Sequence, residues 1–84
     1  MKTIKINPAD NVAVALEALK ANETIEVEGQ VLTLNTDIPA GHKFLLTDLT
    51  AGENIIKYGY PIGHLPESRN QGDLVSQHYI KSNL

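Results

Sequence analysis

The sequence of 84 residues contains no cysteine, which excludes disulfides, zinc–thiolate sites and cysteine nucleophiles. It has no tryptophan and one phenylalanine, so the core must be built from isoleucine, leucine, valine and alanine. No apolar run approaches the roughly 18 residues that a membrane span needs, and the first residues lack the apolar stretch of a signal peptide. We therefore expect a cytoplasmic protein that has no contact with a membrane.

Basic residues are also scarce. Seven lysines and arginines stand against ten acidic residues, giving a formal net charge of −3. The basic residues are scattered, whereas a nucleic-acid-binding domain normally gathers them in a patch. Hydrophobic residues make up 42% of the chain, which is typical of a folded protein. These values predict one small domain over residues 1–84 that does not bind nucleic acid.

A helix start is predicted after a first short strand. Residues 3–6 alternate between polar and apolar side chains, which is the pattern of a strand. Next, either Asn7 caps a helix with Pro8 at its first position, or Asp10 is the cap.

The following residues have helical spacing. Val12, Leu16 and Leu19 lie at i, i+4 and i+7, which puts one apolar stripe on a helix of about three turns. Asn22 is suited to the left-handed conformation that ends a helix. We expect this helix to be the only substantial one.

The apolar period then changes to two. Residues 24–27 and 31–34 alternate around Glu28-Gly29-Gln30, which predicts a β-hairpin. Three later phrases, headed by Gly41, Gly52 and Gly72, repeat a glycine followed by a short apolar run, which predicts a turn with a residue at positive φ and then a short strand. Their unequal spacing excludes a solenoid repeat. The predicted fold class is mainly β with one short helix.

The side chains with useful chemistry fall near predicted strand ends: His42, Lys43, Lys57, Tyr58 and His78. Lysine offers charge to a carboxylate, tyrosine and histidine offer hydrogen bonds to hydroxyls, and histidine can bind a metal or move a proton. Each residue has a plain structural alternative, because lysines beside turns are usually solvated and a tyrosine can be a core aromatic. The two histidines match no metal-binding spacing.

Several phrases, in order along nearly the whole chain, resemble the N-terminal SAF domain of altronate and galactarate dehydratases. They are Ile4-Lys5-Ile6, Asp10-Asn11-Val12-Ala13-Val14-Ala15-Leu16, Gly41-His42-Lys43-Phe44, Leu46-Thr47-Asp48, Ile56-Lys57-Tyr58-Gly59, Pro61-Ile62-Gly63 and Ser82-Asn83-Leu84. The resemblance implies a β-clip fold and a part in dehydrating sugar acids to 2-keto-3-deoxy acids with a divalent metal, typically iron. In this family a larger region carries most of the catalytic groups, so a large catalytic subunit or domain is the expected partner.

The resemblance also suggests roles for the candidate residues. His42 and His78 are expected to be catalytic and to face the substrate or the metal, while Lys43, Lys57 and Tyr58 bind the sugar acid. One departure weakens the metal hypothesis: members often read Val-His-x-His-Asn near the end of this domain, whereas Ser76 and Tyr79 replace the first histidine and the asparagine here.

Two alternatives stay open. SAF-type β-clips also occur in sialic-acid synthases, antifreeze proteins and pilus or flagellar assembly factors, so the chain is alternatively a non-catalytic binding or assembly module. A homodimer joined through exposed strand edges is the other alternative.

Overall fold

The computed structural model describes residues 2–5 and 7–75. These residues form eight short strands: β1 Thr3–Ile4, β2 Val12–Ala15, β3 Thr24–Val27, β4 Gln30–Thr33, β5 Lys43–Leu45, β6 Asn54–Lys57, β7 Tyr60–His64 and β8 Leu74–Val75. The mainly-β prediction is confirmed for this part of the chain. None of the described residues lies in a helix, so none of them forms a helix able to cross a bilayer.

The predicted early helix is wrong, because Val12–Ala15 forms β2 and pairs with β1 on one side and β5 on the other. The expected cap builds a turn instead. The Asn7 Oδ1 accepts a hydrogen bond from the Ala9 N–H at 2.8 Å, and the Asn7 carbonyl accepts one from the Asp10 N–H at 2.9 Å. The Val-Ala-Val-Ala run is apolar on both faces, which suits a central strand. Its hydrogen bonds to β1 and β5 outweigh the helical preference expected from the spacing of Val12, Leu16 and Leu19.

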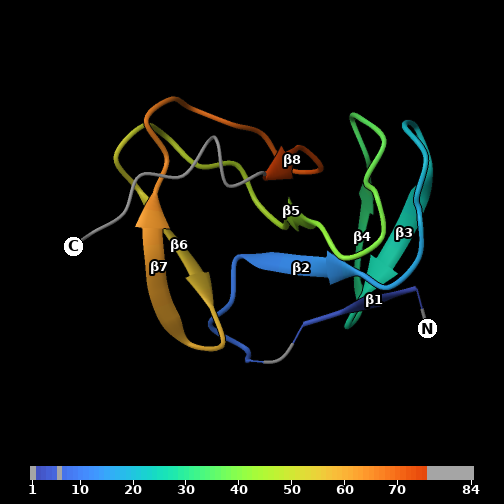
Figure 1. Ribbon diagram of the computed structural model, residues 1–84, viewed down its shortest axis with the longest axis horizontal. Helices are drawn as coiled ribbons and strands as arrows, with labels where there is room; N and C mark the ends of the chain where they lie inside the picture. The colour runs from blue at the N-terminus through green and yellow to red at the C-terminus, as the bar shows by residue number, and fades with distance from the viewer. Residues whose placement is uncertain (1, 6, 76–84) are drawn as a thin grey trace.

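The four-stranded sheet β1-β2-β5-β8 is antiparallel and carries a separate core on each face. Directly opposed residues share a face, so Val14 and Lys43 lie on one face while Ala13 and Phe44 lie on the other. The face of Lys43 packs against the hairpin β6–β7, in a core of Val12, Leu45, Leu49, Ile55, Leu65 and Val75. The face of Phe44 packs against the hairpin β3–β4. Figure 1 shows the sheet between the two hairpins.

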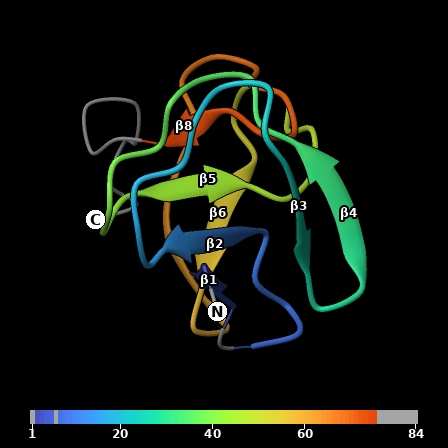
Figure 2. The same cartoon turned by 90° about the vertical axis from the view of Figure 1, so that its right-hand side faces the viewer.

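The described chain is built from two similar halves related across the β2–β5 pair. Each half runs from a central strand through a turn to a hairpin and a second turn, so that β2, β3 and β4 correspond to β5, β6 and β7. The turns are held alike: the Asn22 N–H donates to the Leu34 carbonyl, as the Gly52 N–H donates to the Leu65 carbonyl, both at 2.8 Å. Figure 2 shows the strands from the side of β3 and β4.

The glycine-led phrases behave as predicted. Gly41, Gly52 and Gly72 take φ values of +83°, +88° and +88°, and β5, β6 and β8 follow them. The fourth equivalent turn, before β3, has Asn22 at φ +70°. The left-handed conformation expected at Asn22 is therefore confirmed, although it opens a strand and does not end a helix.

Candidate functional site

Lys43 is a half-buried cation at the start of β5, opposite Val14 of β2 and Val75 of β8. Partial burial, and then the nearby positive charge of Lys57, lower the pKa of Lys43 below its ordinary value. The ion pairs of the described residues are Lys2–Glu23 and Arg69–Glu67, and neither involves Lys43 or Lys57. Two neighbouring cations without a carboxylate from the described chain favour a bound anion.

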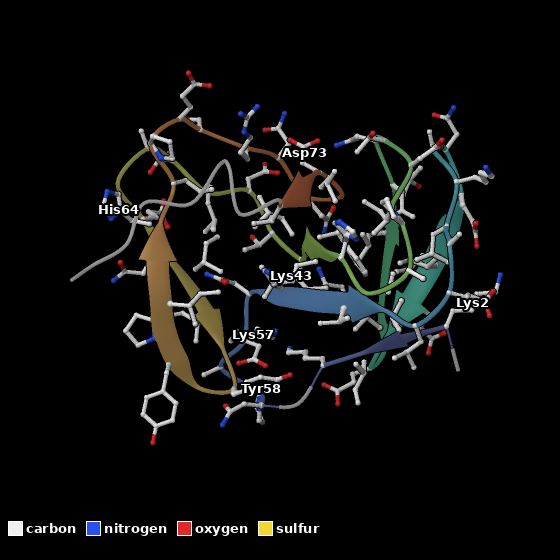
Figure 3. The ribbon with its side chains drawn as sticks, in the orientation of Figure 1. Lys2, Lys43, Lys57, Tyr58, His64 and Asp73 are labelled. Carbon is white, nitrogen blue, oxygen red and sulfur yellow. The ribbon has the colours of Figure 1, made fainter. Side chains whose placement is uncertain are left out.

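Lys57 ends β6 and reaches the same side of the sheet as Lys43 (Figure 3). Its Nζ lies 4.8 Å from the centre of the Tyr58 ring, a cation–π contact that holds the ammonium at the tip of the hairpin. Tyr58 is 51% exposed, which leaves its side chain open to a ligand. The three residues predicted to bind the acid therefore lie on one side of the molecule.

The conformation of Tyr58 comes from its turn. Tyr58 and Gly59 have φ of +56° and +80°, and Glu28 and Gly29 in the other hairpin have +49° and +86°. Positive φ at both central residues is the requirement of a tight two-residue hairpin turn. Because Glu28 shares this conformation, the strain at Tyr58 reflects the turn type and is no sign of function.

Sequence reasoning missed the residues that fix this hairpin. The buried Asp10 accepts hydrogen bonds from the Gly59 N–H at 2.8 Å and from the Asn7 N–H at 3.2 Å. Asn11 binds β6 along its edge: its Oδ1 accepts from the Ile56 N–H at 2.8 Å and its Nδ2 donates to the Asn54 carbonyl at 2.9 Å. The Asp-Asn phrase, interpreted above as part of a helix, thus ties the hairpin of Lys57 and Tyr58 to the sheet.

Three of the four equivalent turns end on an acidic residue that closes its own turn. Each carboxylate accepts a hydrogen bond from the backbone N–H three residues earlier: Glu23 from Lys20 at 3.2 Å, Glu53 from Thr50 at 3.0 Å and Asp73 from Asn70 at 2.8 Å. The fourth turn ends on His42 and begins at Pro39, which has no N–H to donate. His42 is therefore relieved of the structural task that its three counterparts perform.

The imidazole of His42 is exposed on a fixed backbone. The His42 N–H donates to the Pro39 carbonyl at 3.1 Å, and the His42 carbonyl accepts from the Ala15 N–H at 2.9 Å. The ring Nδ1 lies 3.4 Å from the Ala40 carbonyl oxygen. This contact turns the ring toward its own turn, and the structure records no contact between it and Lys57 or Tyr58. His78, the other predicted catalytic residue, lies outside the described residues.

A groove of about 610 Å³ lies apart from these residues, between β1 and β3. It is lined by Lys2–Lys5 and Thr24–Glu28, and none of the predicted site residues contributes to it. The predicted acid-binding residues Lys43, Lys57 and Tyr58 therefore lie on the surface outside this groove.

The described residues do not fit a complete metal site. Residues 2–5 and 7–75 contain no group of three or more histidines, cysteines or carboxylates placed to hold an ion. His42 is a single exposed imidazole, and structural or catalytic metal sites need at least three protein ligands in most cases.

Comparison with known proteins agrees with the resemblance seen in the sequence. The altronate/galactarate dehydratase SAF domain matches residues 1–83. The altronate dehydratase of Escherichia coli (strain K12) is 45% identical over 84 residues, and that of Bacillus subtilis (strain 168) is 36% identical over 81 residues. The (2R)-sulfolactate sulfo-lyase subunit alpha of Paracoccus pantotrophus is 41% identical over 51 residues, which cover 61% of this chain and 76% of that subunit.

The matches to the dehydratases cover 100% and 96% of this chain but 17% and 16% of those enzymes. The similarity therefore concerns one small region of a much longer protein. Because the family match extends over almost all of the sequence, the chain belongs to the altronate/galactarate dehydratase SAF domain family.

Proposed function

We propose that this domain supplies the acid-binding face of a sugar-acid dehydratase, altronate or galactarate dehydratase-like, whose larger part carries most of the catalytic groups. The observation that carries the proposal is the pair of neighbouring lysines, Lys43 and Lys57, with the lowered pKa of Lys43. Relatives are named as an altronate dehydratase and a sulfolactate lyase subunit, and both names denote acids that are anionic at neutral pH.

The lysine pair suits the charge that such a reaction develops. A base of the assembled enzyme takes the proton α to a carboxylate, which puts a second negative charge on the carboxylate oxygens, and the β-hydroxyl accepts a proton from an acid and leaves as water. Two cations beside these oxygens stabilise the transition state more than the ground state, because the charge grows during the step. Tyr58 then offers a hydrogen bond to a substrate hydroxyl, and His42 offers a group able to move a proton.

The remaining components belong to the partner. We propose a divalent metal, with iron as the first candidate, held mainly by ligands of the large subunit or domain, since the described residues do not form its site. His42 and His78 remain candidate catalytic residues, and any contribution that they make to the metal is completed by that partner. The assembled enzyme is expected in the cytoplasm.

Reconstitution tests the proposal. The chain is mixed with the large dehydratase polypeptide of the same organism, identified by its similarity to the part of the E. coli altronate dehydratase outside the matched region. Release of 2-keto acid from altronate and galactarate is then measured. We expect the chain to raise the rate at least tenfold, and His42→Ala to remove most of this gain while its circular dichroism and melting temperature stay those of the wild type.

A non-catalytic binding or assembly module gives a different result. Under that alternative the complex forms, but the large polypeptide has the same rate with and without this chain. If His42→Ala keeps full activity, His42 is not a catalytic residue. The role of Lys43 and Lys57 is then tested by their own variants.

A further inference from the structure

Strand β7 exposes large apolar side chains that contribute little to the core. Tyr60 is 74% exposed and Ile62 is 40% exposed, with the exposed Pro61 between them. Five large hydrophobic residues are exposed in the described chain, and three of them lie between Tyr58 and Ile62. Soluble proteins that expose such groups together commonly use them to bind another protein.

The corresponding hairpin has polar residues at three positions that are apolar in β6–β7. In β3–β4 the equivalent positions of Ile56, Tyr58 and Tyr60 hold Glu26, Glu28 and Gln30. The inward-facing positions Ile25 and Ile55 are buried in both hairpins. The other hairpin also exposes Val31, opposite Glu26, but it folds with polar residues at these three positions, so apolar side chains there are not required for folding.

The edge of β7 is unsuited to strand addition. Pro61 has no N–H for a new ladder, and the pairing of β6 with β7 shifts register between Ile55 and Ile56. A partner must therefore contact side chains. Residues 54–65 contain no acidic residue and include Lys57 and His64, so this face suits an apolar surface with carboxylates at its rim.

We propose that the exposed apolar residues Tyr60, Pro61 and Ile62 of β7 form the surface on which the larger part of the dehydratase docks. This inference rests on the proposed function. The altronate dehydratases extend far beyond the 17% and 16% of their length that this chain matches, so a large body accompanies the domain in those relatives. Docking on β7 places Tyr58 and Lys57, one turn away, at the junction between the domain and that body.

A second copy of the chain fits this face less well. A symmetric dimer through β7 would bring the two hairpins together around a two-fold axis, each bearing Lys57 and no carboxylate. The like charges would oppose each other without compensation from the hairpins. Aromatic and branched aliphatic side chains beside a cation are, in contrast, typical anchors for a different protein.

Isothermal titration calorimetry of the chain against the large dehydratase polypeptide tests the docking surface. Tyr60→Ser is expected to weaken the affinity at least tenfold, and Ile62→Thr about three- to tenfold. Val31→Thr is the matched control, because Val31 is 63% exposed on β4 of the other hairpin, and it should change the affinity less than twofold. Circular dichroism melts verify that each variant folds.

Each outcome decides the proposal. If both β7 variants bind the large polypeptide with wild-type affinity, the docking surface is overturned. The acid-binding role is unaffected by this result, because it is tested by the reaction rate of the complex. The proposal would also fail if ultracentrifugation showed a dimer of the wild-type chain that Tyr60→Ser dissociates. Weakened binding by the β7 variants, in a complex whose rate does not depend on Lys43 or Lys57, would support the docking surface and refute the acid-binding role.

Discussion

His42 and Asp73 occupy the same position in the two halves of the chain, after Gly41 and Gly72 respectively. The Asp73 carboxylate closes its turn by accepting a hydrogen bond from the Asn70 N–H at 2.8 Å. His42 cannot do so, since Pro39 stands where Asn70 stands. Pro39 and His42 stand where the other turn has Asn70 and Asp73, so the turn of His42 lacks the side-chain hydrogen bond that closes the other three.

A double-mutant cycle measures this exchange. Pro39→Asn restores the N–H and His42→Asp restores the acceptor, so the double variant should gain about 0.5–1.5 kcal/mol of unfolding free energy beyond the sum of the single changes. Both variants with His42→Asp should lose activity in the reconstituted enzyme. Urea denaturation gives the coupling energy, and additive single effects would show that the carboxylates do not close these turns.

Tyr58→Asn separates stability from function in the hairpin turn. Asn-Gly is the preferred pair for a turn with positive φ at both positions, whereas tyrosine is strained there. The variant should be more stable, because it relieves part of a backbone strain of about 1–3 kcal/mol and loses an exposed cation–π contact with Lys57 of only about 0.5–1 kcal/mol. It should also raise the KM for the sugar acid. Glu28→Asn, in the equivalent turn, is the control that should gain stability without changing the KM.

Asp10→Ala should destabilise the domain by about 1.5–3 kcal/mol, because a buried carboxylate bonded to two N–H groups is lost. Asp37→Ala removes one exposed bond, to the Ala21 N–H at 2.9 Å, and should cost less than about 1 kcal/mol. Thermal and urea unfolding compare the two. Equal losses would show that Asp10 has no special role in holding the hairpin.

The lowered pKa of Lys43 predicts how acid binding depends on pH. The ammonium must be charged to hold a carboxylate, so the KM should rise as pH passes through a value below the ordinary 10.5 of lysine. Lys43→Arg should move this rise to higher pH, because a guanidinium keeps its charge. A KM that is flat up to pH 10.5 in the wild-type enzyme would argue against a charged Lys43 in binding.

Stability should change in the opposite sense across the same range. Between the folded pKa and 10.5 the unfolded chain binds the proton that the folded chain has lost, so the unfolding free energy rises with pH. This contribution is fully present above 10.5 and is lost as pH falls through the folded value. Lys43→Met should remove this dependence, as measured by urea denaturation at a series of pH values.

The sequence predicted correctly those parts of the fold that depend on residues close together in the chain. The alternation around Glu28-Gly29 and the glycines before β5, β6 and β8 specify hairpins and turns through neighbouring residues alone. The helix predicted from Val12, Leu16 and Leu19 is wrong, because the apolar run Val12–Ala15 is equally suited to a central strand. Its pairing partners β1 and β5 decide the conformation, and no local pattern reveals them.

The candidate site was predictable in part. The sequence pointed to Lys43, Lys57 and Tyr58, and the fold brings the two lysines near one another. The supporting contact of Asp10 with Gly59 joins residues 49 positions apart, so sequence inspection could not find it. A comparison of the four glycine or asparagine turns would have shown that only the turn ending at His42 has no acidic residue at its last position.

The most direct test is the ratio kcat/KM of the reconstituted enzyme for the sugar acid when Lys43 and Lys57 are both replaced by methionine. A fall of about a hundredfold is predicted, with Lys20→Met, an exposed lysine in the turn before β3, unchanged. The double variant should be at least as stable as the wild type, because the neighbouring charges are gone. A folded double variant that keeps the wild-type kcat/KM would contradict the claim that this domain binds the acid.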